Sequence, residues 1–67
     1  MYKCIIWSNS SYPREYMVAS KSVMRAAVEF GRCEGGEVVQ IETMTGRVLS
    51  RARWTPEDGG KYIRVCV

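Results

Sequence analysis

Hydrophobic and polar positions alternate most clearly between Glu37 and Trp54. Two alternating segments flank Thr45-Gly46, where glycine can adopt the positive φ that a two-residue hairpin turn requires. Because the side chains of a strand point alternately to opposite faces, this register separates two sets of residues. The apolar set is Val39, Ile41, Val48, Ala52 and Trp54. The segment therefore predicts a β-hairpin with one face packed on a core.

The other face of this hairpin gathers polar side chains. With the two-residue turn, the cross-strand pairs on it are Met44–Arg47, Glu42–Leu49, Gln40–Arg51 and Val38–Arg53. The arginines Arg47, Arg51 and Arg53 would then share one side of the sheet, and they are the first candidate binding residues.

Two weaker patterns precede the hairpin. Tyr2–Trp7 is a short apolar run that predicts a strand, and Ser8–Pro13 has the composition of a loop. Arg14–Val18 predicts a second, weaker strand.

A helix is predicted next. Ser20 and Ser22 are both candidate N-caps, the helix ends near Phe30, and Gly31 is a natural stop. Charged residues recur at intervals of four, four and three and form one solvent-facing stripe: Lys21, Arg25, Glu29 and Arg32.

The C-terminal part predicts a turn over Thr55–Gly60 and a last strand over Tyr62–Val67. If Ile63 and Val65 face the core, Tyr62 and Arg64 join the arginine face.

The element order is therefore β(β)αβββ. It predicts an α+β fold in which one helix packs on the apolar face of a curved, mostly antiparallel sheet of four to five strands. The 67 residues form one domain, 1–67, and a domain of this size buries only about 60% of its unfolded surface. We expect a monomer or a weak dimer.

Composition adds a modest positive charge. The net charge is +3, and seven of the ten basic residues are arginine, which suits bidentate contacts to phosphate or carboxylate. This charge is compatible with an acidic protein partner and with nucleic acid, and it decides between neither.

The chemistry of an enzyme is missing from the sequence. There is no histidine, the three cysteines Cys4, Cys33 and Cys66 are widely spaced, and no nucleophile lies in a known motif. We therefore expect no catalytic activity, no metal or other cofactor and no small-molecule substrate. Reduced cysteines, and no stretch of about 20 apolar residues, favour a protein of the cytoplasm that does not enter a membrane.

The run from Ser20 to Gly46 resembles a known family. Without gaps it places Ser20, Ser22, Arg25, Cys33, Gly35, Val38, Ile41-Glu42-Thr43 and Gly46 in register with small phage-encoded anti-CRISPR proteins, the type I-F inhibitor family numbered nine. The basic, aromatic pair Lys61-Tyr62 of the last strand agrees as well. Two further basic positions of the family fall on Ala26 and Phe30 here, and Arg32 lies two residues beyond the second.

The resemblance implies a fold and a function. Members fold as a five-stranded antiparallel sheet with one helix, bind the backbone subunits of the RNA-guided surveillance complex and obstruct target DNA. It implies a non-enzymatic inhibitor of a type I, I-F-like complex that acts in the host cell cytoplasm, with Arg25 at a partner-binding position.

Two basic surfaces compete for this role: the helix stripe of Lys21, Arg25 and Arg32, and the sheet face of Arg47, Arg51, Arg53 and Arg64. Each is also compatible with an ordinary solvated face. The alternative function is a small nucleic-acid-binding module of a phage or mobile element, in which the sheet arginines contact phosphates and a nearby aromatic stacks on a base.

Overall fold

A computed structural model describes residues 1–8, 11–31 and 36–65 of the chain. Its elements are β1 (Tyr2–Ser8), β2 (Ser11–Val18), α1 (Val23–Ala26), a π-helical continuation of α1 (Ala27–Gly31), β3 (Val38–Glu42), β4 (Val48–Thr55), a 3-10 turn (Pro56–Asp58) and β5 (Lys61–Val65). The five strands form one antiparallel sheet in the order β2-β1-β3-β4-β5. The predicted α+β fold and the order ββαβββ are confirmed.

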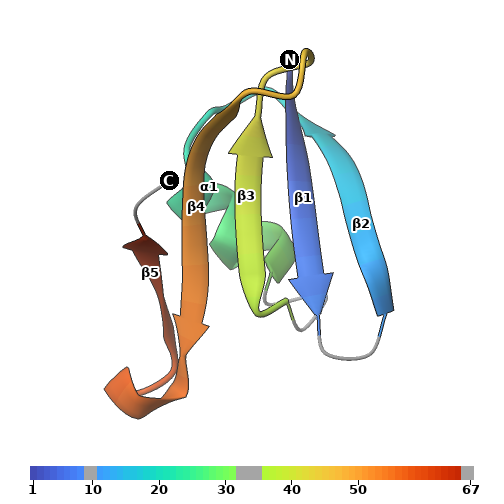
Figure 1. Ribbon diagram of the computed structural model, residues 1–67. Helices are drawn as coiled ribbons and strands as arrows, with labels where there is room; N and C mark the ends of the chain where they lie inside the picture. The colour runs from blue at the N-terminus through green and yellow to red at the C-terminus, as the bar shows by residue number, and fades with distance from the viewer. Residues whose placement is uncertain (9–10, 32–35, 66–67) are drawn as a thin grey trace.

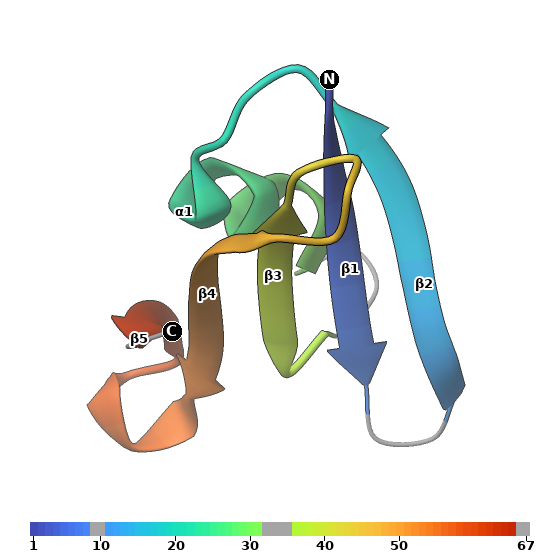
Figure 2. The ribbon, with the colours of Figure 1, turned by 45° about the horizontal axis from the view of Figure 1, so that its top comes forward.

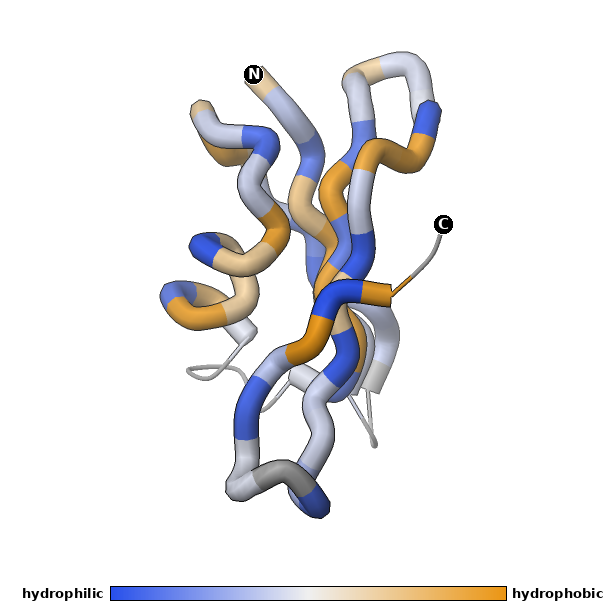
Figure 3. The backbone as a smooth tube through the Cα atoms, turned by 90° about the vertical axis from the view of Figure 1, so that its left-hand side faces the viewer, coloured by the Kyte–Doolittle hydropathy of each residue, from blue (hydrophilic) through white to orange (hydrophobic). Residues whose placement is uncertain are grey.

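The helix lies behind β3 and β4 in Figure 1, and the turned view of Figure 2 shows the sheet curving beside it. Seen from the side, helix and sheet make two layers (Figure 3). The core lies between these layers and consists of Cys4, Ile6, Val23, Ala26, Ala27, Val39, Ile41, Ala52 and Tyr62. No described element covers the other face of the sheet.

Strand β2 is longer than the sequence predicts. It starts at Ser11, so the predicted loop of residues 8–13 is wrong over its second half. Pro13 is tolerated because β2 lies at the edge of the sheet, and the pairing with β1 shifts register between Ile6 and Ser8. Edge strands and bulges are the places where proline costs a sheet little.

The helix begins as predicted. The Ser22 side chain accepts a hydrogen bond from the Arg25 amide, and Ser20 Oγ accepts one from the Ser22 amide, so both serines act at this helix start. Gly31 is the last helical residue, but its backbone has no positive φ. Glycine is needed there for space, because a Cβ atom would lie 2.6 Å from Tyr62 Oη and 3.0 Å from Val39 Cγ2.

The turn of the β3–β4 hairpin differs from the prediction. The Thr43 amide donates to the Arg47 carbonyl at 2.9 Å and the Gly46 amide donates to the Thr43 carbonyl at 3.0 Å, which makes a three-residue loop. Gly46 has φ of 94°, so the expected left-handed glycine is confirmed while the two-residue turn is wrong. This is the hairpin type in which a glycine bulge follows a tight turn.

A second irregularity lies inside the hairpin. Gln40–Arg51 and Val38–Arg53 pair as predicted, but Glu42 pairs with Val48 instead of Leu49. The extra residue in β4 is Leu49, which packs against the core. A bulge of this kind reverses the alternation of the residues before it.

The two faces of strand β5 are exchanged relative to the prediction. Tyr62 is buried in the core and pairs with Trp54, whereas Ile63 is exposed and pairs with Arg53. The aromatic pair explains the preference: the Trp54 and Tyr62 rings meet edge to face at 5.0 Å, a geometry that stabilises beyond the area it buries. Arg64 therefore lies on the helix side, and its predicted place on the arginine face is wrong.

Candidate functional site: basic surfaces on two opposite faces

The face of the sheet without a helix, here called the open face, combines apolar and basic side chains. Alternation along the paired strands assigns to it Lys3, Ile5, Trp7, Glu15, Met17, Val38, Gln40, Glu42, Arg51, Arg53, Ile63 and Val65. Two of the predicted sheet arginines, Arg51 and Arg53, thus share this face.

Gln40 organises the centre of the open face. Its Oε1 accepts hydrogen bonds from Arg51 Nε at 2.8 Å and Nη2 at 2.6 Å, while its Nε2 donates to Glu42 Oε2 at 2.5 Å. Gln40 is only 4% exposed, so these bonds satisfy a buried amide. They hold the Arg51 guanidinium in place and leave three of its five N–H groups available.

Arg53 lies one pleat further along β4 and is exposed. It forms no hydrogen bond or ion pair with the residues that the structure describes. Trp7 and Arg53 both pair with Val38, from β1 and β4, so they flank the same residue on the open face.

Trp7 ends the apolar run Tyr2–Trp7 from which the sequence predicts the first strand. The structure places it half-buried on the same side as the arginines. The sequence did not predict which face of β1 holds Trp7. Lys3, Ile5 and Trp7 alternate and share one face, but the run from Tyr2 to Trp7 is too uniformly apolar for its two faces to be distinguished from the sequence.

A second basic surface lies on the other side of the sheet. Lys21, at the start of the helix, and Arg64, in β5, line one groove together with Ser20, Ser22, Leu49 and Ser50. The Ser50 hydroxyl donates to the Lys21 carbonyl at 3.5 Å, which ties the helix start to β4. Neither cationic side chain has a partner among the described residues.

Arg25 completes what we call the helix-side cluster, defined as Lys21, Arg25 and Arg64. Its side chain is 72% exposed and lies 3.9 Å from Glu29, one helical turn on. An exposed pair at this separation neutralises little of its charge.

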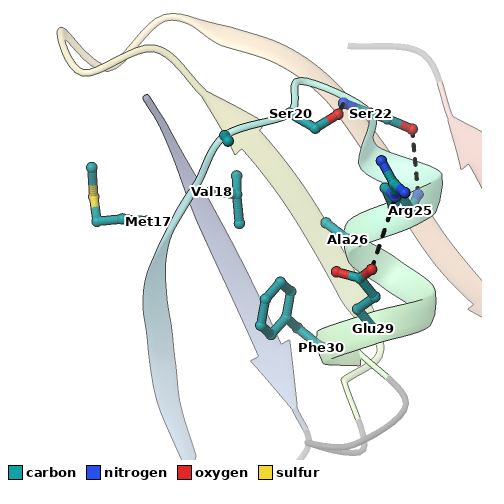
Figure 4. Close-up of a pocket in the computed structure, with 9 residues that line it drawn as sticks. Met17, Val18, Ser20, Ser22, Arg25, Ala26, Glu29 and Phe30 are labelled. Carbon is teal, nitrogen blue, oxygen red and sulfur yellow. Dashed lines mark hydrogen bonds and ion pairs between the residues drawn. The ribbon is translucent and has the colours of Figure 1, made fainter.

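A cavity of about 300 Å³ opens beside Arg25, between the end of β2 and the helix. Figure 4 shows apolar groups of Val18, Ala26 and Phe30 facing it, with Arg25 and Glu29 along the helix. The Phe30 ring stacks on Tyr16 of β2 at 5.2 Å, which holds one wall. The cavity therefore offers an apolar surface next to an exposed cation.

One predicted site residue, Arg47, falls outside both surfaces. Arg47 is exposed in the β3–β4 loop, and the bulge at Leu49 puts it out of phase with Arg51 and Arg53. Arg32 lies outside the described residues, as do Cys33 and Cys66. The remaining five, Lys21, Arg25, Arg51, Arg53 and Arg64, divide between the two faces.

Cys4 is a structural residue of the core. Its side chain is fully buried, and burial raises the pKa of its thiol to about 11. A thiol with this pKa is protonated near neutral pH and is a poor nucleophile.

Within residues 1–8, 11–31 and 36–65, no group of three or more His, Cys, Asp or Glu side chains is arranged to hold a metal ion. No helix in this same part of the chain is long and apolar enough to cross a membrane.

No protein-family model matches the chain, and comparison with curated proteins and with solved structures finds no match either.

Proposed function

We propose that the protein is a non-enzymatic inhibitor that binds a type I, I-F-like CRISPR surveillance complex and blocks its binding of target DNA in the host cytoplasm. In this proposal the partner is formed by the backbone subunits of the complex, and the helix-side cluster makes the contact.

The observation that carries the proposal is the gathering of Lys21, Arg25 and Arg64 on one side of the fold. Lys21 and Arg64 line one groove, and Arg25 lies one turn further along the helix. The sequence resemblance implies that basic residues on and near the helix contact the partner. The fold itself, a five-stranded antiparallel sheet with one helix, is also the one that the resemblance implies.

The proposed mechanism is steric occlusion. In it, the cationic side chains of the helix-side cluster occupy acidic or DNA-facing sites on the partner protein and thereby exclude target DNA. Complementary charges would steer the encounter and fix its orientation. The apolar cavity beside Arg25 would supply the packing that charges alone do not, because interface energy concentrates where apolar groups are desolvated.

The test is direct binding to purified surveillance complexes. We expect the protein to bind a type I-F complex that is immobilised on a sensor. A complex that has bound the protein should then lose affinity for a matching target duplex. A complex of an unrelated CRISPR type is the control. Absence of capture by every type I complex at micromolar concentration would refute the proposal.

A further inference from the structure

The open face carries a row of side chains that runs across four strands. Trp7 pairs with Val38, Val38 with Arg53, and Arg53 with Ile63. Because neighbouring strands lie about 4.8 Å apart, the backbones of Trp7 and Arg53 are about 10 Å apart, with Val38 between them. An indole and a guanidinium are therefore presented on either side of Val38, on a face of the sheet that no described element covers, with no carboxylate in the row.

The charges of this face leave an excess of cations. Its two carboxylates already have partners: Glu15 lies 3.5 Å from Lys3, and Glu42 accepts the Gln40 amide. Arg53 has no partner among the described residues. Lys61 alternates with Tyr62 in β5 and so belongs to the open face with Ile63, and its side chain has no partner among these residues either. The row itself holds the Arg53 guanidinium and no carboxylate, so an anion bound along it meets a positive charge.

Arg51 supplies a second, pre-oriented cation. Its Nε and Nη2 are held by Gln40 at 2.8 and 2.6 Å, so less side-chain entropy is lost when its free N–H groups bind an anion. Arg51 and Arg53 are two residues apart in β4 and point to the same face, with a spacing of about 6.8 Å along the strand. Two phosphates of one extended chain can be contacted by such a pair.

We infer that the open face binds single-stranded nucleic acid, with a base stacked on Trp7 and successive phosphates on Arg53 and Arg51. An aromatic side chain beside arginines on a sheet is a platform that accepts any base, because every base has a π-face. A duplex keeps its bases stacked inside and would leave the indole unused. An acidic protein would use the same arginines but has no need of a stacked indole. The inference does not depend on the proposed function, which uses the opposite side of the molecule.

The experiment is a fluorescence anisotropy titration of a labelled 12-nucleotide oligo(dT) with the full-length protein at 50 and 200 mM salt. Two phosphate contacts on a single strand predict a slope of about −1.4 in log–log form, which is roughly a sevenfold loss of affinity between these salts. The matching 12-base-pair duplex should bind more weakly than the single strand at 50 mM salt.

Variants locate the site. Trp7→Ala should weaken binding at least about fivefold, Trp7→Phe should weaken it less, and Arg53→Gln should also lower the salt slope by about 0.7. Arg64→Gln is the matched control, because it removes the same charge from the helix side and should change affinity less than twofold. In a Trp54→Phe background, the remaining tryptophan, Trp7, should be quenched on binding. Circular dichroism confirms that each variant is folded.

Three results would overturn the inference: no binding of the folded protein at 50 mM salt, equal losses from Arg64→Gln and Arg53→Gln, or unquenched Trp7 emission at saturation. The first would show that the open face binds no single strand, and the second would reduce the binding to non-specific attraction by net charge.

Discussion

Tyr62 connects three parts of the fold through one side chain. Its hydroxyl donates to the Gly36 carbonyl, and its ring meets Trp54 edge to face. The hydroxyl and the ring of Tyr62 also lie close to the last helical residue, Gly31. Strand, helix end and the start of the β3–β4 hairpin are joined at this point. The sequence marks Gly31 as a helix stop, but the close contact that requires glycine depends on Tyr62, which is distant in the chain.

Gly31→Ala should destabilise the protein by about 1–3 kcal/mol, the usual cost of overpacking a core. The new Cβ would lie 2.6 Å from Tyr62 Oη and 2.9 Å from Cζ, so the ring must move and its hydrogen bond to Gly36 is strained. Urea unfolding followed by circular dichroism measures the loss.

Tyr62→Phe supplies the control for this prediction. It removes the atom nearest to the added methyl group, so the two substitutions together should cost less than the sum of their separate effects. Strict additivity would show that Gly31 is not constrained by Tyr62.

Cys4 links stability to pH. Burial raises the pKa of its thiol from 9.0 to about 11, so the folded state holds the proton that the unfolded chain releases first. This contribution is complete below pH 9 and is lost as the pH rises toward 11. Full loss corresponds to about 2–3 kcal/mol.

We therefore expect the urea concentration at the unfolding midpoint of the wild-type protein to decrease as the pH is raised from 8.5 to 10.5. Cys4→Ala has a lower midpoint at pH 7 because it leaves a cavity, but its midpoint should fall less over this interval. Parallel declines in the two proteins would contradict the assignment to Cys4.

At the scale of the elements, the β3–β4 hairpin was the most predictable part of the chain. Its alternation gave the strands, the pairs Gln40–Arg51 and Val38–Arg53, and the left-handed glycine. The alternation did not predict the bulge at Leu49, because the same pattern of hydrophobic and polar residues also fits two strands that pair without a bulge. Arg47 was misplaced for that reason.

Gly46→Ala should cost about 1–2 kcal/mol through the backbone alone. Gly46 has φ of 94°, and a Cβ added there meets nothing within 4 Å, so sterics with neighbours play no part. Gly46→Asn is the matched variant and should cost less, because asparagine adopts this conformation more readily. Thermal unfolding of the three proteins gives the order, and equal midpoints for all of them would contradict it.

The sequence predicted β5 as a strand but not which of its side chains face the core. Tyr62 and Arg64 alternate with Ile63 and Val65, and aliphatic residues are the usual choice for a core. The larger aromatic side chain is buried instead because Trp54 and Gly31 form a site that fits it. Such complementarity arises only when distant segments meet.

The whole molecule presents cations on two opposite faces. Arg51 and Arg53 lie with Trp7 on the open face, and Lys21, Arg25 and Arg64 lie around the helix. The sequence predicted both groups but assigned Arg64 to the wrong one. The meeting of Lys21 with Arg64 follows from the sheet order, in which β5 lies next to β4 and the helix crosses both.

The proposed function is tested most directly by comparing charge reversals on the two faces for their effect on binding to purified type I-F surveillance complex. Each reversal lowers the net charge of +3 by two, so Arg25→Glu and Arg64→Glu are matched to Arg53→Glu in total charge. We expect each helix-side reversal to weaken capture at least about tenfold, equivalent to about 1.4 kcal/mol, whereas Arg53→Glu should change it less than twofold. A loss from Arg53→Glu that equals or exceeds the losses from Arg25→Glu and Arg64→Glu would contradict the proposed function.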